Sequence, residues 1–342
     1  MGHVRTALIG YGLAGRVIHR PLLTSVDALQ LTHVVTSDPV RRSEAAADLP
    51  TASVLADVDE LWSHADEFDA VVVATSNDAH VDLATRALEL RKAVVVDKPL
   101  APTCAEAATL VRRARSLGVP LTVFHNRRWD SDTLTAQELL ASGRLGTVYR
   151  MESRFTRFRP HVADRWRERP GSGGILLDLG THLVDQALHL LGPVESVYAE
   201  IATRRPGAVV DDDCLLVLTH VSGTSSVLWC SATAPWTGPR LVLQGSRAGW
   251  VKQDLDGQEA AQRCGTVVQA EPDGLLWNTL GAKPVLSRTG DWAAFYRRFA
   301  GAVLDGGPLP VDPYDAVTVL SVLEAARLSA EHGQVVPVQP LA

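Results

Sequence analysis

Cysteine is scarce in this chain, and its few copies are spaced too widely to form a cluster. The 342 residues include four cysteines, none of them in a C-x-x-C pair: Cys104, Cys214, Cys230 and Cys264. Zinc sites made of cysteines and disulfide frameworks both have recognisable paired spacings. The sequence therefore argues against both a zinc site made of cysteines and a disulfide framework.

An excess of positive charge is also missing. The chain carries 33 Lys and Arg against 39 Asp and Glu, which gives a formal net charge of −6. Such a chain has no general attraction to nucleic acid or to an anionic membrane. No stretch is apolar over the length of a bilayer span, and the first residues lack the pattern of a signal peptide. We therefore expect a cytoplasmic protein that binds neither nucleic acid nor membrane.

What the sequence does have is enough apolar residues for two domains. Hydrophobic residues make up 46% of the chain and charged residues 21%. The first third alternates helical segments with continuous apolar runs, which indicate strands buried on both faces and hence a parallel sheet. These runs are "VRTALIGYG", "LQLTHVVTSD", "DAVVVATSN", "KAVVVDKPL" and "PLTVFHNRR". We expect residues 1–123 to form a doubly wound α/β (Rossmann) domain.

The remaining residues, 124–342, predict an α+β domain with a large, mostly antiparallel open sheet. Its strands are expected in "TVYRMESRFTRFRP", "VESVYAEIATRR", "CLLVLTHVSGTSSVLWCSAT" and "PRLVLQGSRAGWVKQD". Residues 291–305 and 313–332 are predicted to be helices. Residues 256–290 carry no clear pattern and stay unassigned.

A glycine motif follows the first predicted strand and opens a helix. "IGYGLAG" places Gly10, Gly12 and Gly15 in the G-x-G-x-x-G register of dinucleotide-binding loops. The glycines allow a tight turn and close approach of a pyrophosphate, and the following helix presents unpaired N–H groups to it. The expected cofactor contacts in this loop are Gly10, Tyr11, Gly12, Leu13, Ala14 and Gly15.

The end of the second strand decides between NAD and NADP. An NAD site usually has an acid there, which binds the ribose 2′-hydroxyl. If Thr36 takes that position, Thr36 and Ser37 offer hydroxyl groups, and Arg41 and Arg42 can meet a 2′-phosphate. If Asp38 takes it, NAD is favoured. The residue types lead us to expect NADP, with NAD as the open alternative.

The candidate catalytic elements are Lys98 and a predicted helix, 173–192, that carries a row of polar side chains. Asp97 and Lys98 directly follow a buried strand, where open α/β sheets bind their ligands. The segment 173–192 is mostly apolar, yet it carries acids and imidazoles at helical spacing: Asp178, His182, Asp185 and His189. At i, i+4 the carboxylate of Asp178 can orient the imidazole of His182 and raise its pKa. We predict an acid–base group here, and no metal, because Asp178, His182 and His189 lack a convergent third ligand direction.

The chain also resembles a known protein family. The motifs "GYGLAG", "ATSNDAH", "DKP", "FHNRRWDSD", "RWRE", "DLGTHLVDQ" and "LPVDPYDAVTVLSVLEAARLSA" are similar to those of the glucose–fructose oxidoreductase/inositol dehydrogenase (Gfo/Idh/MocA) family. The likeness runs along essentially the whole chain. Its motifs look most like those of NADP-dependent scyllo-inositol dehydrogenases.

The resemblance implies hydride transfer between nicotinamide and a hydroxyl-bearing carbon of a cyclic polyol or sugar. The implied catalytic set is Lys98, Asp178 and His182, and either Lys98 or His182 can be the base. Implied cofactor contacts are Thr75, Ser76, Asn77, His80, Asp97, Lys98, Asn126, Trp166 and Arg167. Asp97 stands where the family usually has Glu. The expected substrate contacts are Lys98, Arg127, Arg154, Asp178 and His182. A homodimer or homotetramer is implied by resemblance alone.

Two other functions stay open beside this one, and a third, nucleic-acid binding, is disfavoured. The stretch "YRMESRFTRFRPHVADRWRER" interleaves arginines with aromatics, as single-strand binders do, but the acidic chain argues against nucleic acid. An NAD-dependent glycosidase that works by transient oxidation would use the same cofactor fold. A non-catalytic nucleotide-sensing regulator would also share it, although such proteins can lose the lysine or the histidine that this chain keeps. The sequence does not identify the substrate.

Overall fold

The chain divides into two units, each described here by itself. The computed structural model describes residues 2–171, 173–266 and 274–339. Contacts between Cα atoms group 2–126, 258–266 and 291–317 into unit 1, and most of the remaining described residues into unit 2. The sequence predicts one boundary, after residue 123. In the structure two later segments also pack into unit 1.

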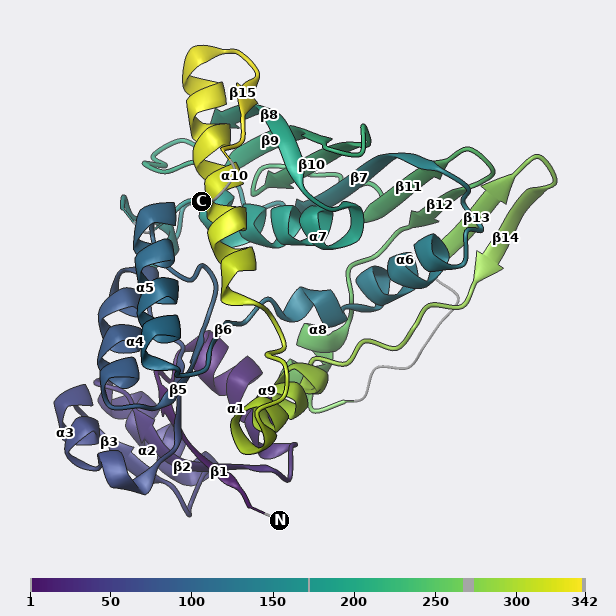
Figure 1. Cartoon of the computed structure of the whole chain (residues 1–342). Coiled ribbons are helices and arrows are strands. Elements are labelled where there is room, and N and C mark those ends of the chain that lie inside the picture. Colours follow the sequence, from purple (N-terminus) through teal and green to yellow (C-terminus); the bar gives the residue numbers. More distant parts are fainter. Residues whose placement is uncertain (1, 172, 267–273, 340–342) are drawn as a thin grey trace. The chain divides into compact units, whose positions relative to one another are not determined.

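Unit 1 contains a parallel sheet, as predicted (Figure 1). In the described residues its strand order is β3-β2-β1-β4-β5-β6, and every neighbouring pair is parallel. The strands are β1 (Val4–Ile9), β2 (Leu29–Val35), β3 (Ser53–Leu55), β4 (Ala70–Val73), β5 (Ala93–Val96) and β6 (Leu121–Val123). Every residue of β4 and β5 is buried, which is why both strands are continuous apolar runs. The short edge strand β3 has no such run and was not predicted.

Helices surround this sheet. α1 and α9 pack on β2 and β1, whereas α4 packs on β4 and β5 and contacts α5. The helical elements are η1 (Ala14–His19), α1 (Arg20–Thr24), α2 (Pro39–Asp48), α3 (Val58–Ser63), η2 (Ala65–Glu67), η3 (Asn77–Ala79), α4 (His80–Glu89), α5 (Cys104–Leu117), α8 (Gln258–Cys264), α9 (Ala293–Asp305) and the start of α10 (Pro313–His332).

The core of unit 1 joins early and late parts of the chain. The rings of His19 and Phe124 lie 4.4 Å apart between centroids, and those of Phe124 and Phe295 lie 4.9 Å apart. The Tyr296 hydroxyl lies 2.6 Å from Nδ1 of His19. All four side chains are buried. Helix α9 therefore fills the core of a sheet that precedes it by more than 150 residues.

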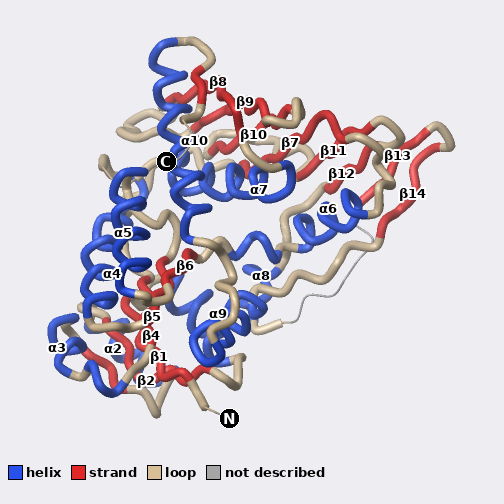
Figure 2. Tube along the Cα trace, in the orientation of Figure 1, coloured by secondary structure: helices blue, strands red, loops and turns tan. Residues whose placement is uncertain are grey.

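Unit 2 contains a larger sheet, drawn as red strands in Figure 2. In the described residues the order is β14-β13-β12-β11-β7-β10-β9-β8-β15, and only β7 and β10 pair in parallel. The strands are β7 (Val148–Thr156), β8 (Val194–Ala202), β9 (Asp213–His220), β10 (Ser225–Ser231), β11 (Leu241–Gly245), β12 (Gly249–Lys252), β13 (Gly274–Asn278), β14 (Gly281–Val285) and β15 (Val336–Pro337). The predicted, mostly antiparallel sheet is confirmed. β13 and β14 lie in the stretch that the sequence left unassigned.

One face of this sheet is buried, and the other is partly exposed. Met151, Leu243, Trp250 and Leu276 pair across four strands and are all buried. Helix α7 packs on β7 and β10 and contacts α6. The helical elements of unit 2 are η4 (Asn126–Trp129), α6 (Ser131–Ala141), η5 (Trp166–Glu168), η6 (Leu176–Gly180), α7 (Thr181–Leu191) and the rest of α10. None of the helices in the described residues combines the length and apolar character that a membrane span requires.

Candidate active site

The glycine loop after β1 is packed too closely for side chains. Gly10 has φ +101°, and a Cβ at this residue would lie 2.3 Å from the Ala74 carbonyl oxygen. A Cβ at Gly15 would lie 1.9 Å from the carbonyl oxygen of Gly10. The loop thus brings strand, turn and helix into direct backbone contact, and the N-terminal end of η1 begins at Ala14. This geometry fits the cradle of a dinucleotide pyrophosphate.

The other loop residues divide between the interior and the surface. Tyr11 is buried and donates a hydrogen bond from its hydroxyl to Asp48 Oδ2 at 2.9 Å. Burial and this carboxylate raise the pKa of Tyr11. Leu13 is 48% exposed. The space above Gly12 is open except for the Arg41 guanidinium, which lies 3.6 Å from where a Cβ would be.

The end of β2 places Thr36, and not Asp38, directly after the strand. β2 ends at Val35, and the Thr36 amide donates a hydrogen bond to the Leu55 carbonyl. Asp38 is instead the N-cap of α2, where its carboxylate accepts hydrogen bonds from the amides of Val40 and Arg41.

The two arginines after β2 differ in their roles. Nη1 of Arg42 donates to the Ser37 carbonyl at 2.7 Å and to the Thr36 carbonyl at 3.3 Å, so Arg42 holds the turn together. Arg41 is about half exposed, and its Nε lies 3.7 Å from Asp38 Oδ2. Because its guanidinium also lies beside Gly12, Arg41 is the arginine here that can reach a group bound at the glycine loop.

The loops after β4 and β5 are joined by a buried imidazole. His80, the first residue of α4, lies with Nδ1 at 2.8 Å from the Pro99 carbonyl oxygen and Nε2 at 3.4 Å from the Thr75 carbonyl oxygen. Burial lowers the pKa of His80, which favours the neutral ring. The sequence predicts a cofactor contact for His80. In the structure the ring links the loop of Thr75 to the loop of Lys98 and Pro99, whose peptide bond is cis.

Asp97 is held in the ionised form beside the candidate lysine. Oδ1 accepts a hydrogen bond from the Lys98 amide at 2.8 Å, and Oδ2 lies 3.8 Å from Nε2 of His19. Burial by itself would raise the pKa of Asp97, but the interactions with His19, together with the charges of Lys98 and His80, lower it to about 2. Lys98 therefore lies in a loop at the carboxyl ends of the parallel strands, next to the negative charge of the Asp97 carboxylate.

In unit 2 both acids of the segment 173–192, Asp178 and Asp185, are paired with arginines. Nε of Arg167 donates to Asp178 Oδ1 at 3.1 Å, and Nη2 of Arg128 lies 2.5 Å from Asp185 Oδ1. The His182 ring stacks on Phe155 at 6.3 Å between centroids, with 24° between the planes. The carboxylates that looked out of place in an apolar helix thus have charged partners.

The predicted helix over 173–192 begins later and less regularly than expected. It starts at Leu176 with the π-helical turn η6, and α7 follows from Thr181. A π turn hydrogen-bonds from i to i+5, so Asp178 does not continue the α-helical stripe of the residues after it. Such single wide turns are frequent at functional sites.

A charged cavity lies within unit 2 beside Asp178. Its polar lining consists of Arg157, Arg159, Arg165, Arg167, Glu168, Asp178, Arg205 and Asp211. Arg167 stacks on the Trp166 ring at 4.4 Å while it holds Asp178. Trp166 and Arg167, which the resemblance assigns to the cofactor, thus belong to the same cluster as the candidate catalytic carboxylate.

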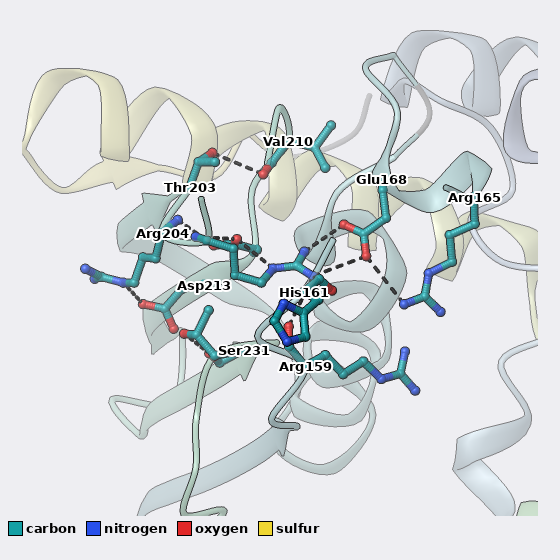
Figure 3. Close-up of polar contacts among 12 residues, drawn as sticks. Arg159, His161, Arg165, Glu168, Thr203, Arg204, Val210, Asp213 and Ser231 are labelled. Carbon is teal, nitrogen blue, oxygen red and sulfur yellow. Dashed lines mark hydrogen bonds and ion pairs between the residues drawn. The ribbon is translucent and has the colours of Figure 1, made fainter. Parts of the chain in front are cut away.

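Arg205 fixes the segment that lines this cavity. Figure 3 shows that segment, with Arg159, His161, Arg165 and Glu168 labelled. Its side chain is 5% exposed and donates to Asp212 Oδ2 at 2.9 Å and to Glu168 Oε2 at 2.7 Å. It also reaches the carbonyl oxygens of Arg159 and His161, each at 3.4 Å. Arg205 therefore ties the segment 159–168 to β9 by way of the residue that precedes that strand.

The remaining predicted site residues lie elsewhere. Asn126 is buried at the start of η4. Arg127 is buried, pairs with Asp130 at 2.9 Å and stacks on Phe155. Arg154 pairs with Glu152 at 3.2 Å and packs against Gly238, and it lines a separate cavity with Arg240.

Several charged residues of this region were not predicted from the sequence. They are Arg128, Arg205, Asp211 and Asp212, each of which forms an ion pair or lines the cavity. Glu168 was expected to pair with an arginine of its stretch, and it lies 3.5 Å from Arg165. A carboxylate such as Asp212 in the acidic triplet at 211–213 carries no local pattern that names its partner. The one usable signal was the excess of arginines over 154–169.

Comparison with known proteins extends over nearly the whole chain. Residues 4–125 match the family model described as oxidoreductase family, NAD-binding Rossmann fold, and residues 133–251 match the GFO/IDH/MocA C-terminal domain. The uncharacterized oxidoreductase YdgJ of Escherichia coli is 38% identical, over 96% of this chain and 97% of its own. The scyllo-inositol 2-dehydrogenase (NADP(+)) IolW of Bacillus subtilis is 33% identical, over 96% of this chain and 94% of its own.

A solved structure leads to the same assignment. The structure of the oxidoreductase yvaA from Bacillus subtilis matches this chain with a TM-score of 0.92 and 32% sequence identity, over 98% of this chain and 99% of its own. A protein of nearly the same length thus shares the fold of this chain. The chain belongs to the Gfo/Idh/MocA family of oxidoreductases, and its first sheet is an NAD(P)-binding Rossmann fold.

Proposed function

We propose that this enzyme transfers a hydride between NADP and a hydroxyl- or keto-bearing carbon of a cyclic polyol or sugar. The observation that carries the proposal is the 33% identity, over almost the full length of both chains, to an NADP-dependent scyllo-inositol 2-dehydrogenase. The chain also retains a lysine, a histidine and a carboxylate that can serve such a reaction: Lys98, His182 and Asp178.

The proposed mechanism gives each of these residues one task. In the oxidative direction His182 takes the hydroxyl proton, and Lys98 holds the oxygen and stabilises its developing negative charge. Asp178 orients the reacting group, and its hydrogen bond to Arg167 fixes the carboxylate. The bound dinucleotide supplies the hydride acceptor. The Phe155 ring lies nearly parallel to the His182 ring, at 6.3 Å between centroids.

The preference for NADP is supported by the end of β2. Asp38, the acid that would favour NAD, accepts hydrogen bonds from the first turn of α2. Arg41 lies beside Gly12, where a 2′-phosphate can pair with it. Replacing Arg41 by Ala should raise the KM for NADP+ about tenfold and leave the KM for NAD+ nearly unchanged. An equal effect on both cofactors would show that Arg41 does not contact the 2′-phosphate.

A substrate panel tests the proposed function as a whole. Inositols, inososes, aldoses, deoxysugars and amino-sugars are offered with NADP+ or NAD+, or with the reduced cofactors for the keto compounds, and absorbance is followed at 340 nm. We expect turnover of at least one cyclic polyol or sugar, faster with the phosphorylated cofactor. Hydrolysis of a nitrophenyl glycoside by protein with tightly held NAD, without net change at 340 nm, would instead identify an NAD-dependent glycosidase.

Single substitutions test the catalytic assignment. Lys98→Ala and His182→Ala should each lower kcat by roughly 10²- to 10⁴-fold, the usual contribution of acid–base groups. NADP+ affinity, measured by fluorescence titration, should change far less. Lys283→Ala and His332→Ala are matched controls at exposed positions. Near-normal kcat in both Lys98→Ala and His182→Ala would rule this mechanism out.

The open face of the large sheet supports self-association. One row of paired residues crosses it through seven strands and is mostly apolar and partly exposed, with Val242 buried: Tyr198, Val217, Val227, Glu152, Val242, Val251 and Leu275. Contiguous apolar surface of this kind marks protein interfaces. We propose a homodimer or homotetramer through this face. Light scattering should give at least twice the chain mass, and Val227→Glu should lower it.

A further inference from the structure

Three side chains of unit 1 that serve none of the functions above bring metal-ligating atoms together. His33 Nε2 lies 3.4 Å from Glu67 Oε2, and His64 Nδ1 lies 3.1 Å from Glu67 Oε1. One ligand atom from each residue lies within 4.8 Å of the other two. The sequence alone does not predict a metal site, because His33 is distant from His64 and Glu67 in the chain.

The local fold explains why these residues meet. His33 lies in β2 and pairs with Ser53 of β3. Helix α3 ends at Ser63, so His64 lies in the turn that leads into η2, which ends at Glu67. Residues at i and i+3 eclipse one another in a 3₁₀ turn, and this places His64 and Glu67 on the same side. The His33 and His64 rings lie 5.9 Å apart between centroids.

The buried histidine is oriented as a metal ligand would be. The Thr32 hydroxyl donates to the Thr6 carbonyl oxygen and lies 2.9 Å from Nδ1 of His33. In the tautomer whose Nδ1–H donates to this hydroxyl, the lone pair of Nε2 faces Glu67 and is available to a metal ion. Metal-binding histidines are typically fixed in this way, by a hydrogen bond from the ring nitrogen that does not bind the metal. The His33 side chain is 4% exposed, and Phe68 packs edge-on against it at 5.8 Å.

The other two side chains leave the site open to solvent. His64 is 41% exposed and Glu67 is 60% exposed, so an ion can enter and keep water as a further ligand. The basic residues nearby are already engaged: Arg5 pairs with Asp69 at 2.7 Å, and Lys92 lies over the Phe68 ring. Neither cation occupies the space between the two imidazoles and the carboxylate.

We propose that His33, His64 and Glu67 form a binding site for a divalent transition metal, with Zn²⁺ as the reference ion. At the usual Zn–N and Zn–O lengths of about 2.0–2.2 Å, tetrahedral ligand atoms lie about 3.3 Å apart. His33 Nε2 lies at a comparable distance, 3.4 Å, from Glu67 Oε2, and His64 Nδ1 lies 3.1 Å from the other carboxylate oxygen, Oε1. A small rotation of the partly exposed Glu67 carboxylate would present one oxygen to an ion that both imidazoles bind. Imidazole ligands favour Zn²⁺, Ni²⁺ or Cu²⁺ over Mg²⁺ and Ca²⁺.

A bound ion would fasten β2 to the segment that follows α3. Because the three ligands come together only in the folded chain, the metal stabilises the fold by mass action. The consequence is a metal-dependent rise in the thermal stability of the enzyme. This consequence does not depend on the substrate or on the catalytic residues.

Calorimetric titration of the full-length, chelator-treated protein with ZnCl₂ tests the site. We expect one equivalent of binding that Mg²⁺ does not compete with, and a higher melting temperature with Zn²⁺ than with EDTA. His64→Ala and Glu67→Gln should each weaken this binding at least tenfold and abolish the shift in melting temperature. Both positions are partly exposed, so the variants should fold, and circular dichroism checks this.

His332→Ala is the matched control, because His332 is exposed at the end of α10 and lies outside the cluster. It should bind Zn²⁺ as the unsubstituted protein does. If other histidines also bind the ion, the loss of one equivalent in His64→Ala and Glu67→Gln still supports the site. Unchanged binding in both variants, or no binding at 100 µM Zn²⁺, would overturn the proposal.

Discussion

The candidate sites of the two units are built from different parts of the chain, one from backbone and the other from charged side chains. In unit 1 the cofactor loop is made of backbone, since Gly10 and Gly15 have no room for a Cβ. In unit 2 the cavity beside Asp178 is made of long charged side chains, held by pairs such as Arg205 with Glu168. A backbone site needs only the absence of side chains at fixed positions. A site made of ion pairs needs partners that the fold must bring together.

This difference predicts how each unit fails under substitution. A backbone site should be lost through one added methyl group, whereas an ion-pair site should lose stability through an unpaired buried charge. Three substitutions separate these two outcomes, and they follow in order of expected size.

The largest effect is expected at the glycine loop. Gly15→Ala would place its Cβ 1.9 Å from the Gly10 carbonyl oxygen, so the loop must move to accommodate it. We expect binding of NADP+, measured by fluorescence titration, to be abolished. Gly301→Ala is the control, because a Cβ at this residue of α9 meets nothing within 4 Å. Tight cofactor binding by Gly15→Ala would show that unit 1 does not depend on backbone packing.

The second effect concerns Arg205. Arg205→Met leaves Glu168 and Asp212 without their buried partner, and breaking such a pair costs roughly 3–5 kcal/mol. Urea denaturation should show a loss of free energy of unfolding in that range. Arg204→Met is the matched control: its side chain is 56% exposed, so the same change in charge should cost less than about 1 kcal/mol. Equal losses in the two variants would contradict the role given to Arg205.

The smallest effect tests whether unit 1 also relies on charge. The pKa of Asp97 in the folded chain is about 2, below the ordinary value of 3.8. The ionised form therefore stabilises the fold above pH 4, and this stabilisation is lost as the pH falls from 4 towards 2. The advantage of the unsubstituted protein over Asp97→Asn should shrink by roughly 2 kcal/mol between pH 5 and pH 2. A difference that is constant with pH would refute this contribution.

The fold could be predicted largely because its signals are local. The apolar runs that became β4 and β5 and the glycines after β1 each lie within a few residues, so one window contains the whole pattern. β3 was missed because three residues carry too little pattern. The placement of α9 in unit 1 was missed because no local pattern shows which sheet a helix packs against.

The candidate site was predictable only in part, for the same reason. The motif around Lys98 and the spacing of Asp178 and His182 are visible in the sequence. The partner of Asp178 is not, because Arg167 is one of several arginines in its stretch and only the folded loop selects it. Likewise, Asp38 is an acid in the right neighbourhood for NAD, and its use as the N-cap of α2 is visible only in the structure.

The aromatic cluster of His19, Phe124, Phe295 and Tyr296 limits how this enzyme can be dissected. A fragment ending near residue 126 would contain the entire parallel sheet yet leave Phe124 and His19 facing water, because α9 would be missing. A chimeric protein that combines unit 1 with a different second domain would need residues 291–317 in addition to the first 126. During synthesis, the aromatic cluster in the core of unit 1 stays incomplete until α9, which lies in the last quarter of the chain, has been translated.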